Sequence, residues 1–177
     1  MKKNRKVKPD GKILTTTPSG AVSLADRGDL RPLLLLLLFA IPVLLYLQTV
    51  SFGLVHFDDD LILTKNAEFL GHLGNVGKAF WKDAFLEDRG PFYRPLQTVS
   101  YMIDRQISGK GTYWALHLEN IVLMGIISCL LFLLLQRLGG QSLPSFLGSL
   151  LFCVHPLFTS TVAWIPSRGD LQLVLFT

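Results

Sequence analysis

Apolar residues in this chain are gathered into long runs separated by polar stretches. The first run extends from Pro32 to Val50 and contains no charged residue, which is close to the roughly 20 residues that a helix needs to cross a bilayer core. A second run extends from about Trp114 to Leu135 and carries its charged residue and its histidine in the first two turns. Both runs predict transmembrane helices.

A third apolar run, from Leu143 to Ile165, is interrupted by His155 and Pro156. The part before the interruption would form only about 18 Å of helix, so we expect either a helix that continues with a kink through Pro156 or a short re-entrant segment. A fourth run starts at Leu171 and is too short to cross a bilayer. We therefore expect the sequence to be a fragment of a longer protein, inactive by itself.

The pattern as a whole predicts an all-α polytopic membrane protein. Half of the residues are hydrophobic and only 17% are charged, whereas soluble domains carry about a quarter charged residues. A secretory signal peptide is the alternative for the first run, but such a peptide ends at small residues and this run does not. The predicted division is a basic tail at 1–30 and a transmembrane domain at 31–177, with spans at about 32–50, 114–135 and 143–163 and a large loop at 51–113.

Charge along the chain predicts the orientation of these spans. Eight Lys and Arg residues precede the first span against three acidic residues, whereas the loop at 51–113 has seven basic and eight acidic residues. The positive-inside rule then places the N-terminus in the cytoplasm and the loop outside it. By alternation, residues 155–170 face the same side as the loop. We expect a multi-pass protein of the bacterial inner membrane, with the endoplasmic reticulum as the alternative, and no nucleic-acid partner.

Three consecutive acids, Asp58, Asp59 and Asp60, directly follow the first span. Because an Asp at a bilayer centre costs about 2.5–3.5 kcal/mol on insertion scales, they must lie at or beyond the interface. A solvated end of the helix is one interpretation. Adjacent carboxylates also raise one another's pKa, which suits a general base or a cation site. A divalent cation could bind here, but the chain offers no complete set of ligands.

Other polar residues are predicted at the same membrane face. Arg94, in the sequence Phe92-Tyr93-Arg94-Pro95-Leu96, is either an exposed loop charge or a guanidinium that grips phosphate oxygens. His117 and Asn120 share one face at the mouth of the second span, where interhelical hydrogen bonds are an alternative role. The remaining candidates flank the break after the third run: His155, Arg168 and Asp170.

The order of these motifs resembles the N-terminal part of membrane glycosyltransferases of the GT-C fold. The resemblance covers about residues 52–177 and rests on FDDD, FYRPL, the paired His and Asn, and the HP and SRGD segments. It points in particular to the protein O-mannosyltransferases that carry C-terminal tetratricopeptide repeats, and to their bacterial relatives. The chain departs from that pattern where it has Phe158 and Ser160 in place of a His and a Glu, and Met124 in place of a later His.

This resemblance implies a site and a substrate. The acidic pair Asp58 and Asp59 would be catalytic, with Asp60, Arg94, His117, Asn120, His155, Arg168 and Asp170 binding the substrate or its lipid phosphate. The donor would be a sugar on polyprenyl phosphate or dolichyl phosphate, and the acceptor a hydroxyl of a protein or glycan. A transporter or channel component and an inactive membrane scaffold are the alternatives from other classes.

Overall fold

The computed structural model describes residues 30–88 and 90–177, and residues 31–177 form one compact unit. Within these ranges the regular elements are helices, with no strand. The predicted all-α fold is thus confirmed. The basic tail predicted for residues 1–30 lies, except for Leu30, outside the described residues.

Two helices match the first two predicted spans. Helix α1 (Arg31–Tyr46) continues into the 3-10 turn η1 (Leu47–Ser51), and α5 (Trp114–Arg137) follows the loop. Both are long and apolar enough to cross a membrane, as expected for helices that present apolar side chains on all sides. They pack closely because Gly125 has no side chain; a Cβ there would come within 2.8 Å of the Phe39 ring.

The third run forms two short helices joined by a bend. Helix α6 (Ser142–Val154) ends where His155 adopts an extended conformation, and η4 (Pro156–Phe158) leads into α7 (Thr159–Ala163) at 46° to α6. Pro156 supplies no backbone N–H, and the His155 side chain instead accepts a hydrogen bond from the Leu157 amide. The pair is a broken span or a re-entrant loop, the two forms that the sequence predicted.

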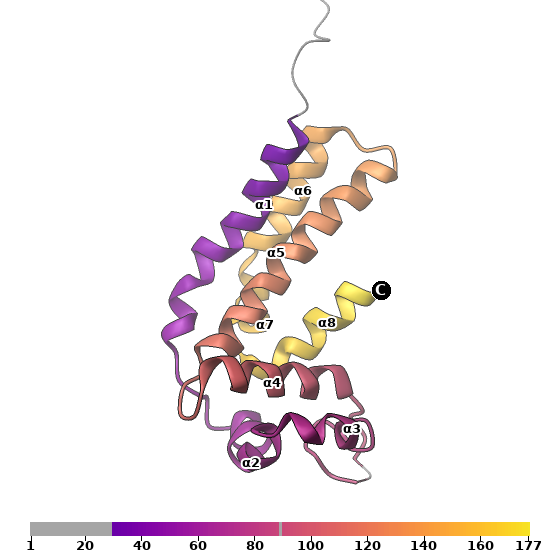
Figure 1. The fold of residues 1–177 in the computed structure, drawn as a ribbon. Coiled ribbons are helices and arrows are strands. Elements are labelled where there is room, and N and C mark those ends of the chain that lie inside the picture. The colour runs from indigo at the N-terminus through magenta and orange to yellow at the C-terminus, as the bar shows by residue number, and fades with distance from the viewer. Residues whose placement is uncertain (1–29, 89) are drawn as a thin grey trace, which may run out of the picture. The chain divides into compact units, whose positions relative to one another are not determined.

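The chain ends in η5 (Ile165–Ser167) and α8 (Arg168–Phe176), and α8 contains the apolar run that starts at Leu171. Figure 1 shows α1, α5 and α6 side by side, with successive helices running in opposite directions. This order brings the segment after α1 and the segment between α6 and α8 to the end of the bundle where α5 begins. Asn120 near the start of α5 donates a hydrogen bond to the Val162 carbonyl of α7.

The loop between α1 and α5 contains short helical elements and one longer helix. The short ones are the π-helical turn η2 (Asp60–Thr64), α2 (Ala67–Leu70), η3 (Leu73–Asn75) and α3 (Val76–Ala79). Buried apolar residues from η2, α2 and α3 pack against α4 (Pro95–Ser108) and the start of α5. The loop therefore has a hydrophobic core of its own, distinct from the core of the bundle.

Helix α4 buries several polar residues and exposes apolar ones. Its buried positions include the polar Gln97, Ser100 and Asp104 beside Tyr101 and Met102, while Ile103 and Ile107 are exposed. In Figure 1 it lies across the start of α5 and α8. A helix with a polar inner face and an apolar outer face suits a position between a polar site and the hydrocarbon of a bilayer.

Candidate functional site

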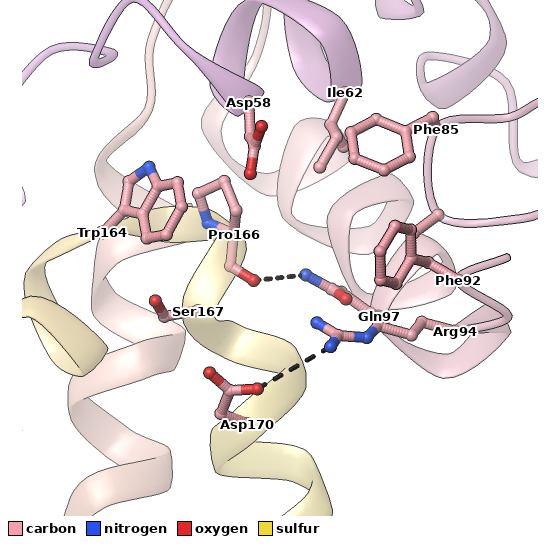
Figure 2. A pocket seen from close by; sticks show the side chains of 11 residues that line it. Asp58, Ile62, Phe85, Phe92, Arg94, Gln97, Trp164, Pro166, Ser167 and Asp170 are labelled. Carbon is pink, nitrogen blue, oxygen red and sulfur yellow. Dashed lines mark hydrogen bonds and ion pairs between the residues drawn. The ribbon is translucent and has the colours of Figure 1, made fainter.

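A pocket of about 230 Å³ lies between the loop and the turn that precedes α8. Its polar lining residues are Asp58, Arg94, Gln97, Ser167 and Asp170, and its larger apolar ones are Ile62, Phe85, Phe92, Trp164 and Pro166. Figure 2 shows Asp58 at one end of this space and the pair of Arg94 and Asp170 at the other. The aromatic rings flank the space between them.

The three consecutive aspartates point to three different environments. Asp58 lines the pocket. Asp59 is almost fully buried, and its carboxylate accepts a hydrogen bond from the Val55 amide at 2.7 Å. Asp60 faces outward, where its carboxylate lies 3.0 Å from the His56 ring nitrogen. Because only Asp58 lines the pocket, it is the member of the cluster placed to contact a ligand there.

Burial raises the pKa of Asp59 above its usual value. The hydrogen bond from the Val55 amide opposes this effect, and the neighbouring charges of Asp58 and Asp60 add to it. Through the hydrogen bond from the Val55 amide, Asp59 fixes the backbone where the chain turns from η1 into η2. Its carboxylate has an oxygen, Oδ1, that is buried without a hydrogen-bond partner.

Arg94 and Asp170 form the charged end of the pocket. Their closest atoms, Arg94 Nη2 and Asp170 Oδ1, are 3.9 Å apart, and both side chains are substantially exposed. Arg94 approaches α8 because residue 169 is glycine: a Cβ at Gly169 would lie 2.6 Å from Arg94 Nη1 and 2.7 Å from Gln97 Oε1. The loose ion pair leaves guanidinium donors available to an anionic ligand.

Helix α4 holds the opposite wall in place through its polar inner face. Gln97 donates hydrogen bonds to the Pro166 carbonyl at 2.8 Å and to the Tyr101 hydroxyl at 2.6 Å. Tyr101 in turn donates to the Ile165 carbonyl at 3.2 Å. Both carbonyls are buried in the turn between α7 and α8, so this turn depends on a helix more than 60 residues earlier in the chain.

A tight loop positions the Phe85 ring. The Asp83 carboxylate accepts hydrogen bonds from the amides of Phe85 at 3.0 Å and Glu87 at 2.8 Å. Leu86 between them has a φ of 64°, an unusual conformation for a branched residue. Its side chain is buried in the core of the loop, which compensates for the strained backbone.

Arg168 lies outside the pocket and is completely buried. Its Nη2 atom is 2.7 Å from a carboxylate oxygen of Asp104, and its Nη1 atom is 2.9 Å from one of Glu119. The guanidinium also stacks over the Tyr101 ring at 4.6 Å. Burial raises the pKa of Asp104 to about 7, with Arg168 opposing the shift and Glu119 adding to it.

Uncharged partners complete the surroundings of this guanidinium. It donates from Nε to Asn120 at 3.0 Å, from Nη1 to the Ser100 hydroxyl at 2.8 Å and from Nη2 to the Leu116 carbonyl at 2.6 Å. Asn120 also donates to the carbonyls of Val162 and Trp164, each at 3.2 Å. The predicted site residues Arg168 and Asn120 therefore lie together, in a buried network beside the pocket.

The two candidate histidines do not line the pocket. His117 is buried in α5, with the Phe52 ring edge-on at a centroid distance of 6.4 Å. His155 is exposed at the bend after α6, where its Nδ1 accepts from the Leu157 amide. Of the predicted residues, the structure thus brings Asp58, Arg94 and Asp170 into one pocket.

Among residues 30–88 and 90–177, no three His, Cys, Asp or Glu side chains are arranged to hold a metal ion. The three aspartates after α1 lie in different environments. Asp58 and Asp170 lie at opposite ends of the pocket. The two cysteines, Cys129 and Cys153, are free thiols.

Three curated proteins show what the chain is similar to. The protein O-mannosyl-transferase TMTC2 of mouse (Mus musculus) is 30% identical over 142 residues, which are 77% of this chain and 17% of the mouse protein. The protein O-mannosyl-transferase Tmtc1 of Drosophila melanogaster is 33% identical over 140 residues, 75% of this chain and 16% of the fly protein. This chain is related to the protein O-mannosyl-transferases.

A third protein O-mannosyl-transferase, TMTC4 of mouse, is 39% identical over 97 residues, 48% of this chain and 13% of that protein. The chain thus spans about a sixth of the length of the protein O-mannosyl-transferases that it matches. No protein-family model matches it, and neither does any solved structure.

Several residues of the pocket and of the network around Arg168 were missed by sequence reasoning. Gln97, Trp164 and the pair of Asp104 and Glu119 were not predicted to take part. The sequence did contain a signal for this helix. Pro95 is typical of a helix start, and apolar residues follow it at 96, 99, 103 and 107. This spacing predicts an amphipathic helix. The polar residues on its other face would then have been candidates.

Proposed function

We propose that this chain forms part of the active site of a membrane glycosyltransferase, which transfers a sugar from a polyprenyl-phosphate or dolichyl-phosphate donor to a protein hydroxyl at the extracytoplasmic face. The observation that supports this most is the pocket itself, with a carboxylate at one end and a guanidinium at the other. The names of the related proteins support the same class of reaction and a mannosyl group as the sugar.

Asp58 is the general base in this proposal. Its carboxylate takes the proton of the acceptor hydroxyl as the hydroxyl oxygen forms a bond to the anomeric carbon of the sugar. The bond between that carbon and the phosphate oxygen breaks, and the lipid phosphate leaves with the electron pair. Asp59 holds Asp58 in place from its buried position, through its bond to the Val55 amide.

Arg94 stabilises the departing phosphate. A lipid phosphate is a stable anion that needs little protonation, so a fixed positive charge serves it better than an acid. The 3.9 Å separation between Arg94 and Asp170 is long for an ion pair, and a phosphate would compete for the same guanidinium. Asp170 keeps the guanidinium beside α8 while the pocket has no anion.

The aromatic walls suit a sugar ring. Trp164 on one side and Phe85 and Phe92 on the other flank the space between Asp58 and Arg94. Their apolar faces would pack against the C–H groups of a pyranose, while the few polar groups fix its orientation. A transporter would instead place charges at mid-span, whereas the residues of α5 from Asn120 to Gln136 carry none.

The test is replacement of Asp58 by Asn in the full-length protein, assayed for sugar transfer from a lipid-phosphate donor in membranes. Loss of a general base lowers rates by about 10²–10⁴-fold, so we expect at least about a hundredfold fall in kcat. Asp88→Asn is the matched control, because Asp88 is exposed in the same loop and pairs with Lys82 away from the pocket.

Unchanged transfer by the Asp58→Asn protein would overturn the assignment of the base. Asp59→Asn adds a further comparison, because the amide oxygen can still accept the bond from Val55. We expect that variant to lose less activity than Asp58→Asn. An equal or larger loss would move the role of the base to Asp59.

A further inference from the structure

We propose that Arg168 is a positioning residue that fixes one wall of the sugar pocket, and that it does not bind the lipid phosphate. The wall is the turn from Trp164 to Asp170, which supplies pocket residues on both sides of Arg168. This inference rests on the proposed function, because it assigns Arg168 a part in the same reaction. The position of the turn from Trp164 to Asp170 should also depend on Arg168 when no substrate is bound.

Burial argues against a phosphate contact. The Arg168 side chain has no exposed surface, whereas that of Arg94 is 42% exposed. All three guanidinium nitrogens already have partners within 3.0 Å. A phosphate would have to displace Asp104 or Glu119 from this guanidinium, and the displaced carboxylate would then remain buried without its partner.

The partners of Arg168 come from the two helices against which the wall must be held. Ser100 and Asp104 belong to α4, and Leu116, Glu119 and Asn120 belong to α5. Arg168 itself is the first residue of α8. One planar group with donors in several directions thus joins three helices at a single point.

The immediate neighbours of Arg168 are pocket residues. Ser167 and Asp170 line the pocket, and Gly169 between them receives Arg94 and Gln97 against its backbone. Asn120 links the guanidinium to the carbonyl of Trp164 at the other end of the wall and to that of Val162 just before it. A shift of Arg168 would therefore move Trp164 and Asp170 relative to Arg94.

A lysine could not replace this arrangement. Its ammonium group is a single point with three donors, whereas the guanidinium donates to acceptors around the edge of its plane in a fixed fork. Arg168→Lys keeps the positive charge between the two carboxylates but loses the bond geometry toward Ser100, Leu116 or Asn120. The charge and the geometry can thus be tested separately.

The experiment compares Arg168→Lys with Arg105→Lys in the purified full-length protein in nanodiscs. Arg105 also lies on α4 and stacks over an aromatic ring, that of Tyr113, but it does not line the sugar pocket. Two kinds of measurement are made for each protein: the kinetic constants KM and kcat per folded molecule with a polyprenyl-phosphate sugar, and deuterium uptake by the backbone amides of residues 162–170.

For Arg168→Lys we expect kcat/KM for the donor to fall at least about tenfold, because displacements near 1 Å can cost about a hundredfold in rate. Uptake at residues 162–170 rises as well, while Arg105→Lys leaves both quantities unchanged. A double variant, Arg168→Lys with Asp104→Asn, loses little more than the worse single variant, because contacting residues act as one unit.

Two results would overturn the inference. Kinetic constants of Arg168→Lys equal to those of the wild type would remove the positioning role, and a higher KM with unchanged uptake would indicate direct contact with the donor. If the wild-type protein transfers no sugar, the proposed function fails. Deuterium uptake alone then decides whether Arg168 fixes the turn from Trp164 to Asp170. A rise in Arg168→Lys but not in Arg105→Lys still supports the structural role, and equal uptake contradicts it.

Discussion

Gly169 controls how closely the charged end of the pocket approaches α8. An added Cβ would meet Arg94 Nη1 at 2.6 Å and Gln97 Oε1 at 2.7 Å. The Arg94 side chain is partly exposed and can move away at little cost, whereas Gln97 is buried and its Nε2 is held by Pro166 and Tyr101. Since Ala is favoured over Gly inside helices by about 0.5–1 kcal/mol, we expect Gly169→Ala to change the free energy of unfolding by less than about 1 kcal/mol.

The same substitution should lower activity, because it displaces the guanidinium that the proposal assigns to the leaving phosphate. We expect kcat/KM for the lipid-linked donor to fall about tenfold or more, measured beside a thermal melt. Gly77→Ala is the control, since a Cβ there meets nothing within 4 Å. Full activity of Gly169→Ala would contradict the placement of Arg94 against α8.

Asp104 makes the stability of the fold depend on pH. Burial raises its pKa from 3.8 to about 7, so between these values the folded state holds a proton that the unfolded state has lost. Stability then falls as the pH rises from about 4 to about 7, by at most about 1.4 kcal/mol per pH unit. In Asp104→Asn, which resembles the protonated acid, we expect this slope to disappear.

Thermal melts of the protein in nanodiscs, recorded from pH 5 to pH 8, measure this slope. Asp88→Asn is the comparison, because Lys82 lowers the pKa of the fully exposed Asp88 and the residue is remote from Arg168. The same slope in wild type and Asp104→Asn would show that the proton is held elsewhere.

Single residues show where sequence reasoning was sufficient and where it was not. The position of Asp58 to Asp60 after an apolar run was enough to place them outside the span, because the cost of burying charge in lipid depends only on sequence and depth. Which aspartate enters the pocket depends on the turn into η2 and on the Val55 amide. Nothing in three identical neighbours distinguishes them before the chain folds.

At the scale of elements, the position of α4 determines more of the site than the positions of α1 and α5 do. Its inner face supplies Gln97 to the pocket and Ser100 and Asp104 to Arg168, while its outer face exposes Leu96, Ile103 and Ile107. This distribution indicates a helix that lies at the bilayer surface with its apolar side toward lipid.

Nitroxide labels on single cysteines test this orientation in lipid vesicles. Labels at Ile103→Cys and Ile107→Cys should collide more with dissolved oxygen, which concentrates in hydrocarbon, than with a water-soluble nickel reagent. A label at Lys110→Cys, exposed just after α4, should show the opposite preference. Equal behaviour of all three labels would place α4 in water.

At the scale of the whole described unit, the alternating direction of the helices assembles the site. The pocket joins residues from three segments, namely the loop after α1, the start of α4, and the turn before α8 together with the first turn of that helix. These segments meet because α5 and α6 return the chain to the end where α4 lies (Figure 1). Asp58, Arg94 and Asp170, which the sequence predicts at one membrane face, line this one pocket.

The sidedness of the membrane can be tested with a thiol reagent that does not cross bilayers. Lys65→Cys lies in the loop after α1, and Gln141→Cys lies between α5 and α6; both positions are exposed. In intact bacterial cells that express a variant without other cysteines, we expect labelling at 65 before lysis and at 141 only after it. Labelling of both positions in intact cells would contradict the antiparallel crossing of α5.

The sequence by itself determined the helical class, the first two spans and the end of the bundle to which the acidic cluster belongs. These follow from the transfer of apolar and charged groups between water and lipid, which is nearly additive along the chain. The tertiary structure decided which polar residues meet: Gln97 with Pro166, Arg168 with Asp104 and Glu119, and Arg94 with Gly169. These contacts depend on the packing of helices distant in sequence, and hydropathy carries no information about that packing.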